Sequence, residues 1–260
     1  MTMPNASPAT LPRAALVTGG AQRIGAAIAR TLAQAGYAVA VHARGSRAQA
    51  DALCAEIAAR GGRARTVLAE LADHDAVLGL VAAATAAVGP LTLLVNNAAE
   101  FQPDEIGKLD RERFDRHFAV NLRAPLFLVQ AFAAQVPAGA DASVVNLLDQ
   151  RVYKPTPHFL TYGLTKSALH TATTTLAQAL APRLRVNAVA PGPTLPSPRQ
   201  DSSAFARQAK ALPLGRGPSP EEIAGAVLYL AEAASVTGVT IAVDGGQRLA
   251  WQTPDMAVEE

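Results

Sequence analysis

The sequence predicts a doubly wound α/β fold, with a central parallel sheet of about seven strands flanked by helices. Short apolar runs alternate with helical patterns along the chain, which is typical of this class. A glycine-rich turn follows the first run, and half of the 260 residues are hydrophobic, enough to bury a large core. Because the alternation is unbroken, we expect one domain over residues 13–252, between a flexible N-terminal tail (1–12) and a C-terminal tail (253–260).

The strands are expected at seven apolar runs. In chain order these are Ala14–Thr18, Ala38–Ala43, Ala64–Glu70, Leu91–Val95, Val144–Leu148, Arg185–Ala190 and Val239–Val243. Runs that are apolar throughout are typical of strands covered on both faces of a parallel sheet. Long helices are expected over about Arg111–Gln135 and from near Tyr162 to Ala181, and acidic residues after Pro220 mark the start of another.

The first turn, Gly19-Gly20-Ala21-Gln22-Arg23-Ile24-Gly25, joins a predicted strand to a predicted helix. Glycines let the backbone approach a pyrophosphate, whose charge is met by free N–H groups and by the positive end of the helix dipole. The turn therefore predicts a dinucleotide site, although one glycine-rich turn is a weak signal by itself.

A second group of reactive side chains lies within Val144–Lys166. Asp149 follows a predicted strand, and Tyr162 and Lys166 are four residues apart, so on a helix they share one face. A nearby ammonium favours the phenolate, and we expect it to lower the pKa of Tyr162 toward the range useful for proton transfer. The spacing is also common on helices without a catalytic role, so it needs support from the rest of the chain.

The end of the second strand bears on the choice of nicotinamide cofactor. It reads His42-Ala43-Arg44-Gly45-Ser46-Arg47 and contains no Asp or Glu. A carboxylate there would bond the ribose 2′-hydroxyl of NAD, whereas Arg and Ser can hold the 2′-phosphate of NADP. The sequence therefore favours NADP(H). The alternative is that Arg44 and Arg47 are merely solvated at the start of the next helix.

Composition argues against several other classes of protein. The net charge is only +2 and no dense run of Lys or Arg is present, so nucleic-acid binding is not expected despite a pI of 8.9. Cys54 is the only cysteine, which makes an internal disulfide impossible, and no Cys/His spacing indicates a metal site. No apolar stretch is long enough for a bilayer and no secretory signal pattern is present, so we expect a cytoplasmic protein without membrane contacts.

With these motifs in view, the chain resembles the short-chain dehydrogenase/reductase family. The family turn Thr-Gly-x-x-x-Gly-x-Gly is matched by Thr18-Gly19 and Gly25, with Arg23 in place of the middle glycine. The remaining family motifs follow in the family's order and at its spacings: Asn96-Asn97-Ala98-Ala99, Asn121, Tyr162 with Lys166, Pro191-Gly192 and Asp244-Gly245-Gly246. The resemblance covers nearly the whole chain and implies the Rossmann form of the fold.

The resemblance also implies roles for single residues. Tyr162, poised by Lys166, exchanges the proton, and Asn121 holds a water in a relay beyond the lysine; the alternative for Asn121 is a bond to a backbone carbonyl. Glu70, where the family usually has Asp, lies beside the adenine. The residues implied to bind the cofactor are Gly19, Arg23, Ile24, Gly25, His42, Arg44, Ser46, Glu70, Leu71, Asn97, Ala98, Ala99, Tyr162, Lys166, Pro191, Gly192 and Thr194.

Two departures from the family pattern make the chain similar to the pteridine reductase branch, which includes bacterial dihydromonapterin and dihydrofolate reductases. Most family members have a serine thirteen residues before the tyrosine, where this chain has Asp149, and the middle glycine of the first turn is Arg23. In that branch the arginine contacts cofactor phosphate and substrate, a phenylalanine placed like Phe101 stacks on the pterin, and the Asp and Tyr deliver a proton. An aromatic residue in such a place is just as often packed under a loop.

The hypothesis from sequence is NADPH-dependent reduction of a pterin, with Arg23, Phe101, Asp149 and Tyr162 facing the substrate. One alternative is a reductase of ketones or 3-oxoacyl substrates, for which Asp149 is awkward because a carboxylate repels a developing alkoxide. Another is a non-catalytic NADP-binding sensor or scaffold. Residues 195–213 are expected to form a substrate lid, and the resemblance implies a homo-oligomer, a tetramer.

Overall fold

The computed structural model describes residues 13–197 and 199–251, and its strands form one parallel sheet in the order β3-β2-β1-β4-β5-β6-β7. The strands are β1 (Ala14–Val17), β2 (Ala38–Ala43), β3 (Arg63–Leu68), β4 (Leu93–Asn96), β5 (Ser143–Leu147), β6 (Arg185–Pro191) and β7 (Thr240–Val243). Each boundary lies within two residues of the predicted one, and the predicted fold class is confirmed. Both predicted tails lie outside the described residues, so the domain boundaries stay predictions.

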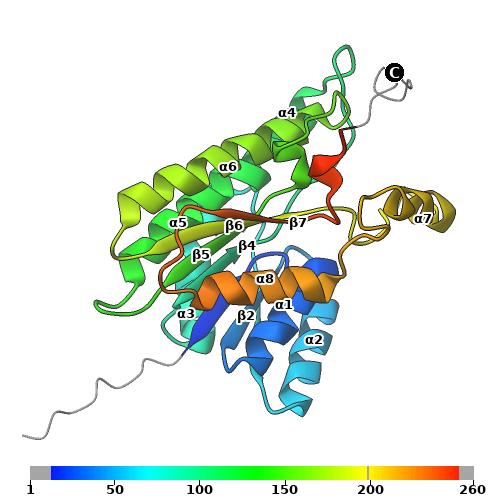
Figure 1. Ribbon diagram of the computed structural model, residues 1–260. Coiled ribbons are helices and arrows are strands. Elements are labelled where there is room, and N and C mark those ends of the chain that lie inside the picture. The colour runs from blue at the N-terminus through cyan, green and yellow to red at the C-terminus, as the bar shows by residue number, and fades with distance from the viewer. Residues whose placement is uncertain (1–12, 198, 252–260) are drawn as a thin grey trace, which may run out of the picture.

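Helices cover both faces of this sheet (Figure 1). One face carries α1 (Arg23–Gln34), α2 (Arg47–Ala59) and α8 (Pro220–Glu232). The other face carries α3 (His74–Val88), α4 (Arg111–Phe118), α5 (Ala124–Gln135) and α6 (Leu160–Leu180). The short helix α7 (Ser202–Lys210) stands apart from both layers. Among the described residues, none of the helices combines the length and apolar character needed to cross a membrane.

The residues of β1 show why the sequence reads as apolar throughout. Ala15 and Val17 belong to the core cluster beneath α1, α2 and α8, whereas Ala14 and Leu16 belong to the cluster on the opposite face. Successive side chains of a strand point to opposite faces, and here both faces are covered by helices. All four residues are consequently buried.

The strand order places a crevice between β1 and β4. Chain connections leave β1 toward β2 on one side and reach β4 on the other, so the loops after these strands diverge. Ligands of doubly wound folds bind at this reversal, beyond the carboxyl ends of the strands. The turns that the sequence singled out, at Gly19 and Asn97, follow β1 and β4 respectively.

Candidate active site

A cavity of about 660 Å³ lies at the crevice, lined by the loops that follow β1 to β4. Twelve of the residues expected to bind the cofactor line it: Gly19, Arg23, Ile24, Gly25, His42, Arg44, Ser46, Glu70, Leu71, Asn97, Ala98 and Ala99. Five remain, Tyr162, Lys166, Pro191, Gly192 and Thr194, and all five line an adjoining cavity described below. The fold therefore gathers these candidates into two neighbouring hollows.

At Gly25 the first turn is packed too closely for a side chain. A Cβ on Gly25 would lie 2.2 Å from the carbonyl oxygen of Gly19 and 2.7 Å from Nδ2 of Asn97. That same Nδ2 donates to the carbonyls of Thr18 (2.8 Å) and Gly19 (3.1 Å), so it ties the turn to β4. The bare backbone facing the N-terminus of α1 fits the close approach of a pyrophosphate.

Arg23 adopts the conformation for which the family usually has glycine. Its φ is 52°, in the left-handed region that an arginine enters at an energetic cost. Its Nη2 donates to the carbonyls of Leu195 (3.2 Å) and Pro196 (3.0 Å). Arg23 consequently lines both cavities.

His42 is a structural support of the turn as well as part of its wall. Nδ1 accepts a hydrogen bond from the backbone N–H of Gly19 (3.0 Å), which leaves Nε2 as the donor to the carbonyl of Ala69 (3.1 Å). Burial lowers the pKa of His42, consistent with this neutral form. The imidazole thus fixes β2, the first turn and the end of β3 relative to one another.

The second cavity, of about 570 Å³, holds the predicted catalytic side chains. It is lined by Asp149, Tyr162 and Lys166, by Pro191, Gly192 and Thr194 after β6, and by parts of the segment expected to form a lid. Arg23, Ile24, Asn97 and Ala99 belong to both walls, so the two cavities adjoin. The reactive groups of Val144–Lys166 therefore face a space next to the dinucleotide site.

Asp149 and Tyr162 form a direct hydrogen bond in this cavity. The phenol donates to Oδ2 of Asp149 over 3.0 Å, and Nη1 of Arg151 donates to the same oxygen, also over 3.0 Å. The backbone N–H of Arg151 donates to Oδ1 over 2.9 Å, because Asp149 caps the short 3₁₀ helix Gln150–Val152. The carboxylate is thereby fixed in place and partly neutralised.

The expectation that Lys166 lowers the pKa of Tyr162 is wrong for this structure. Burial, together with the Asp149 carboxylate, raises the pKa of Tyr162 well above its ordinary value. Lys166 is itself buried, donates to the carbonyl of Leu147 over 2.6 Å, and has its pKa lowered to about 8 by burial. Its Nζ lies 5.7 Å from the centre of the Tyr162 ring. The phenol is therefore protonated at neutral pH, as a proton donor must be.

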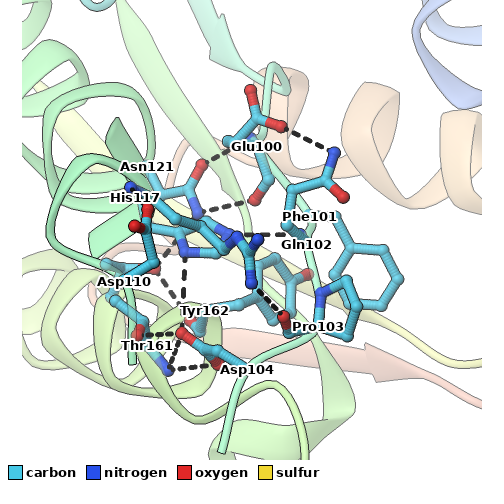
Figure 2. Close-up of polar contacts among 12 residues, drawn as sticks. Glu100, Phe101, Gln102, Pro103, Asp104, Asp110, His117, Asn121, Thr161 and Tyr162 are labelled. Carbon is cyan, nitrogen blue, oxygen red and sulfur yellow. Dashed lines mark hydrogen bonds and ion pairs between the residues drawn. The ribbon is translucent and has the colours of Figure 1, made fainter. Parts of the chain in front are cut away.

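Asn121 lies in a π-helical turn, Ala119–Arg123, that interrupts the predicted long helix between α4 and α5. Its side chain bonds both backbone groups of Glu100: Oδ1 accepts from the N–H (2.7 Å) and Nδ2 donates to the carbonyl (2.9 Å), as Figure 2 shows. Nδ2 also donates to Oγ1 of Thr165 over 3.2 Å. This carbonyl bond is the alternative raised from the sequence, and π-turns often occur at functional sites.

Phe101 packs against aromatic neighbours at the edge of the second cavity. Its ring stacks on Phe159 with centroids 4.4 Å apart and 7° between the planes, and it meets Tyr162 edge-on at 4.7 Å. All three side chains line the cavity. The ring is thus packed against aromatic neighbours while it borders the second cavity, and its stacking on a substrate stays a prediction.

Sequence reasoning missed several residues of the site. Arg151 and Arg199 place guanidinium groups 5.6 Å from the Phe101 ring centre, and Nη2 of Arg199 donates to the Phe101 carbonyl over 2.9 Å. Phe159 has no sequence signal, because it enters the site through a left-handed backbone (φ 59°) at the start of α6. Of these three residues, only Arg151 could have been suspected from the sequence, because it lies two residues after Asp149.

Taken together, the two cavities place the glycine-rich first turn next to the buried phenol of Tyr162. Among the residues that the structure describes, no three His, Cys, Asp or Glu side chains gather as they would around a metal ion. The phenol of Tyr162 and the carboxylate of Asp149 face the same space as the first turn's neighbours Asn97 and Ala99. Such a site can protonate a substrate that lies against a redox cofactor.

Comparisons with known proteins agree with this geometry. The family model described as enoyl-(acyl carrier protein) reductase matches residues 19–248. The chain is 36% identical to an uncharacterized oxidoreductase of Methylorubrum extorquens (91% of this chain, 98% of the relative) and 36% identical to L-xylulose reductase of Bos taurus (90% and 96%). It is 51% identical to FolM alternative dihydrofolate reductase 1 of Brucella canis, solved in complex with NADP, with a TM-score of 0.91 and coverage of 94% and 97%. The chain therefore belongs to the short-chain dehydrogenase/reductase family.

Proposed function

We propose that this protein reduces a pterin with NADPH. As a family member similar to proteins solved with NADP or NADPH, it is an NADP-dependent oxidoreductase. The pterin is the step beyond that. It is supported by the relatives from Brucella canis and Brucella suis, whose names describe an alternative dihydrofolate reductase.

One observation carries the proposal: the phenol of Tyr162 bonds a carboxylate, Asp149, instead of the serine usual in the family. A carboxylate accepts hydrogen bonds from ring N–H groups, which pterins offer, and it stays in contact with the proton donor. A plain ketone gains a negative oxygen during reduction, and the same carboxylate opposes that charge. The Asp149–Tyr162 pair therefore suits protonation at a ring nitrogen.

The described residues divide the work as follows. When bound, the cofactor supplies the hydride. The first turn, which Asn97 ties to β4, would hold the pyrophosphate of the cofactor, and the second cavity, lined by Lys166, would take its nicotinamide end. Tyr162 donates the proton, and Asp149 orients the phenol and returns a proton to it from solvent. Arg151 keeps Asp149 in place.

The test is a substrate panel with NADPH, read by loss of nicotinamide absorbance. Dihydropterins with neutral side chains, dihydrofolate, quinones and small ketones are compared at matched concentrations. Turnover of a dihydropterin or dihydrofolate with kcat/KM at least about tenfold above every ketone supports the proposal. Turnover of a ketone alone contradicts it.

A carbonyl reductase is the second candidate, favoured by the 36% identity to L-xylulose reductase. The same panel separates it, because sugars and 3-oxoacyl thioesters would then be the best substrates. A non-catalytic NADP-binding sensor predicts tight cofactor binding without turnover of any compound.

The exposed position of Arg199 and its bond to the Phe101 carbonyl support the idea that residues 195–213 act as a lid.

We propose further that the protein is a homotetramer of the cytoplasm. Exposed apolar side chains on α4 and α6, Phe114 (37% exposed) and Leu164 (50%), support contacts between copies. Light scattering coupled to size-exclusion chromatography measures the mass directly. A mass of about four times 26.9 kDa is expected, and a monomer would contradict the proposal.

A further inference from the structure

Arg116, a residue of α4 that no motif singles out, lies in the wall of the cofactor cavity between two carboxylates. Its Nε donates to Oε2 of Glu100 over 2.9 Å, and its Nη2 donates to Oε2 of Glu70 over 3.1 Å. Glu70 follows β3 and Glu100 follows β4. One guanidinium therefore joins two of the loops that surround the cavity.

Both carboxylates are held in the charged form. Burial by itself disfavours the charge on Glu70 and Glu100, but hydrogen bonds reverse this and lower the pKa of each. Arg116 supplies such a bond to both. The backbone N–H of Ala72 bonds Glu70, and the side-chain amide of Gln102 bonds Glu100 (Figure 2). The cavity consequently contains two fixed negative charges.

A second cation competes for one of these carboxylates. Nη1 of Arg44 lies 3.7 Å from Oε2 of Glu100, the oxygen that Arg116 also bonds. The Arg44 side chain is 63% exposed and is the residue expected to meet a 2′-phosphate. When Arg44 pairs with Glu100, its positive charge is less available to a 2′-phosphate.

The count of charges shows why Arg116 matters. The ionised side chains that line the cavity are Arg23, Arg44, Arg116, Glu70 and Glu100, an excess of one positive charge. Without Arg116 the excess disappears, and both carboxylates lose the guanidinium that bonds them. A 2′-phosphate brings about 1.5 to 2 negative charges at neutral pH, whereas the 2′-hydroxyl of NAD brings none.

We propose that Arg116 is a specificity-determining residue: it neutralises Glu70 and Glu100, and thereby leaves Arg44 available for the 2′-phosphate of NADP(H). Arg116 acts on the cofactor preference through these two carboxylates. The inference rests on the NADP site and is independent of the identity of the substrate.

The experiment measures dissociation constants of NADPH and NADH by the change in nicotinamide fluorescence on binding. In Arg116→Met, which keeps much of the side-chain length without the charge, NADPH is expected to bind about tenfold or more weakly, while NADH changes by less than about threefold. Arg116→Lys, which keeps the charge, should lose less affinity for NADPH than Arg116→Met. Competition by 2′,5′-ADP against 5′-AMP reports the same contrast without the nicotinamide.

A second variant removes the carboxylate instead of the cation. Glu100→Gln should bind NADPH at least as tightly as the parent, because the carboxylate no longer competes with the 2′-phosphate for Arg44. Arg116→Met combined with Glu100→Gln should recover most of the NADPH affinity that Arg116→Met loses. This recovery distinguishes charge balance from damage to the fold. Equal weakening of NADPH and NADH in Arg116→Met, or weakening of NADPH by Glu100→Gln, overturns the proposal.

Discussion

The phenol of Tyr162 donates a hydrogen bond of 3.0 Å to Oδ2 of Asp149, a residue thirteen positions earlier in the chain. The bond joins the loop after β5 to the first turns of α6, and it pairs a buried phenol with a partly buried carboxylate. The proposed chemistry and the proposed substrate both depend on this pair.

Asp149→Ser restores the residue usual in the family and is expected to separate two kinds of substrate. Reduction of dihydropterin or dihydrofolate should fall about a hundredfold, the loss typical of a positioned proton-transfer group. Reduction of simple ketones should hold steady or rise, since the opposing charge is gone. Asp149→Asn is the matched control, because it keeps the shape of the Asp149 side chain and removes its charge. Undiminished pterin reduction in Asp149→Ser would remove Asp149 from the mechanism.

Tyr162→Phe removes the proposed proton donor and keeps the ring that packs edge-on against Phe101. Turnover should fall by about two or more decades, while the affinity for NADPH stays within about threefold. Stopped-flow measurement of nicotinamide oxidation and a fluorescence titration report these two quantities separately. Equal turnover in parent and variant would show that the proton comes from another group.

Arg44→Ala tests the cofactor preference at an exposed residue of the first cavity. The parent should bind NADPH more tightly than NADH by about 1–3 kcal/mol, and the variant should lose affinity for NADPH much more than for NADH. Calorimetric titration of both cofactors measures the difference. Equal binding of the two cofactors by the parent contradicts the preference.

Lys166 makes the stability of the fold depend on pH. Its pKa is about 8 in the folded state and 10.5 ordinarily, so between these values the unfolded state binds more protons. The free energy of unfolding should therefore rise with pH in this window, by at most about 1.4 kcal/mol per unit. Lys166→Met should lack this rise when urea denaturation of both proteins is compared at pH 7.5, 8.5 and 9.5. Parallel pH dependence in the two proteins would place the pKa of Lys166 outside the window.

Asp104 caps α6, the helix that carries Tyr162 and Lys166, although it lies far away in the sequence. Its buried carboxylate accepts from the N–H (3.1 Å) and the hydroxyl of Thr161, as drawn in Figure 2, while the residue at the N-cap position, Phe159, cannot cap. Asp104→Ala should lower the free energy of unfolding by about 2 kcal/mol. Asp104→Asn, which keeps an acceptor oxygen, should lower the free energy of unfolding by less than Asp104→Ala does. Chemical denaturation of the three proteins checks the order.

Predictions based on local pattern agreed well with the structure. The strands were found within two residues because apolar runs report burial on both faces directly, and this pattern needs no knowledge of the partner strand. The long helix over Arg111–Gln135 was also found, but not its π-turn at Asn121, since that turn is stabilised by bonds to Glu100 and Thr165 from other parts of the chain.

The sequence by itself determined the strands of the sheet, the glycine turn and the choice of Tyr162, Lys166 and Asp149 as candidates. These features depend on apolar periodicity and residue spacing, which involve residues close together in the chain. Only the tertiary structure decided the direction of the Tyr162 pKa, which follows from burial and from the Asp149 carboxylate more than from the lysine four residues away. It also decided that Arg116 lies between Glu70 and Glu100. Burial and ion pairing depend on which segments meet in space, and these contacts arise only when the sheet brings distant loops to one edge.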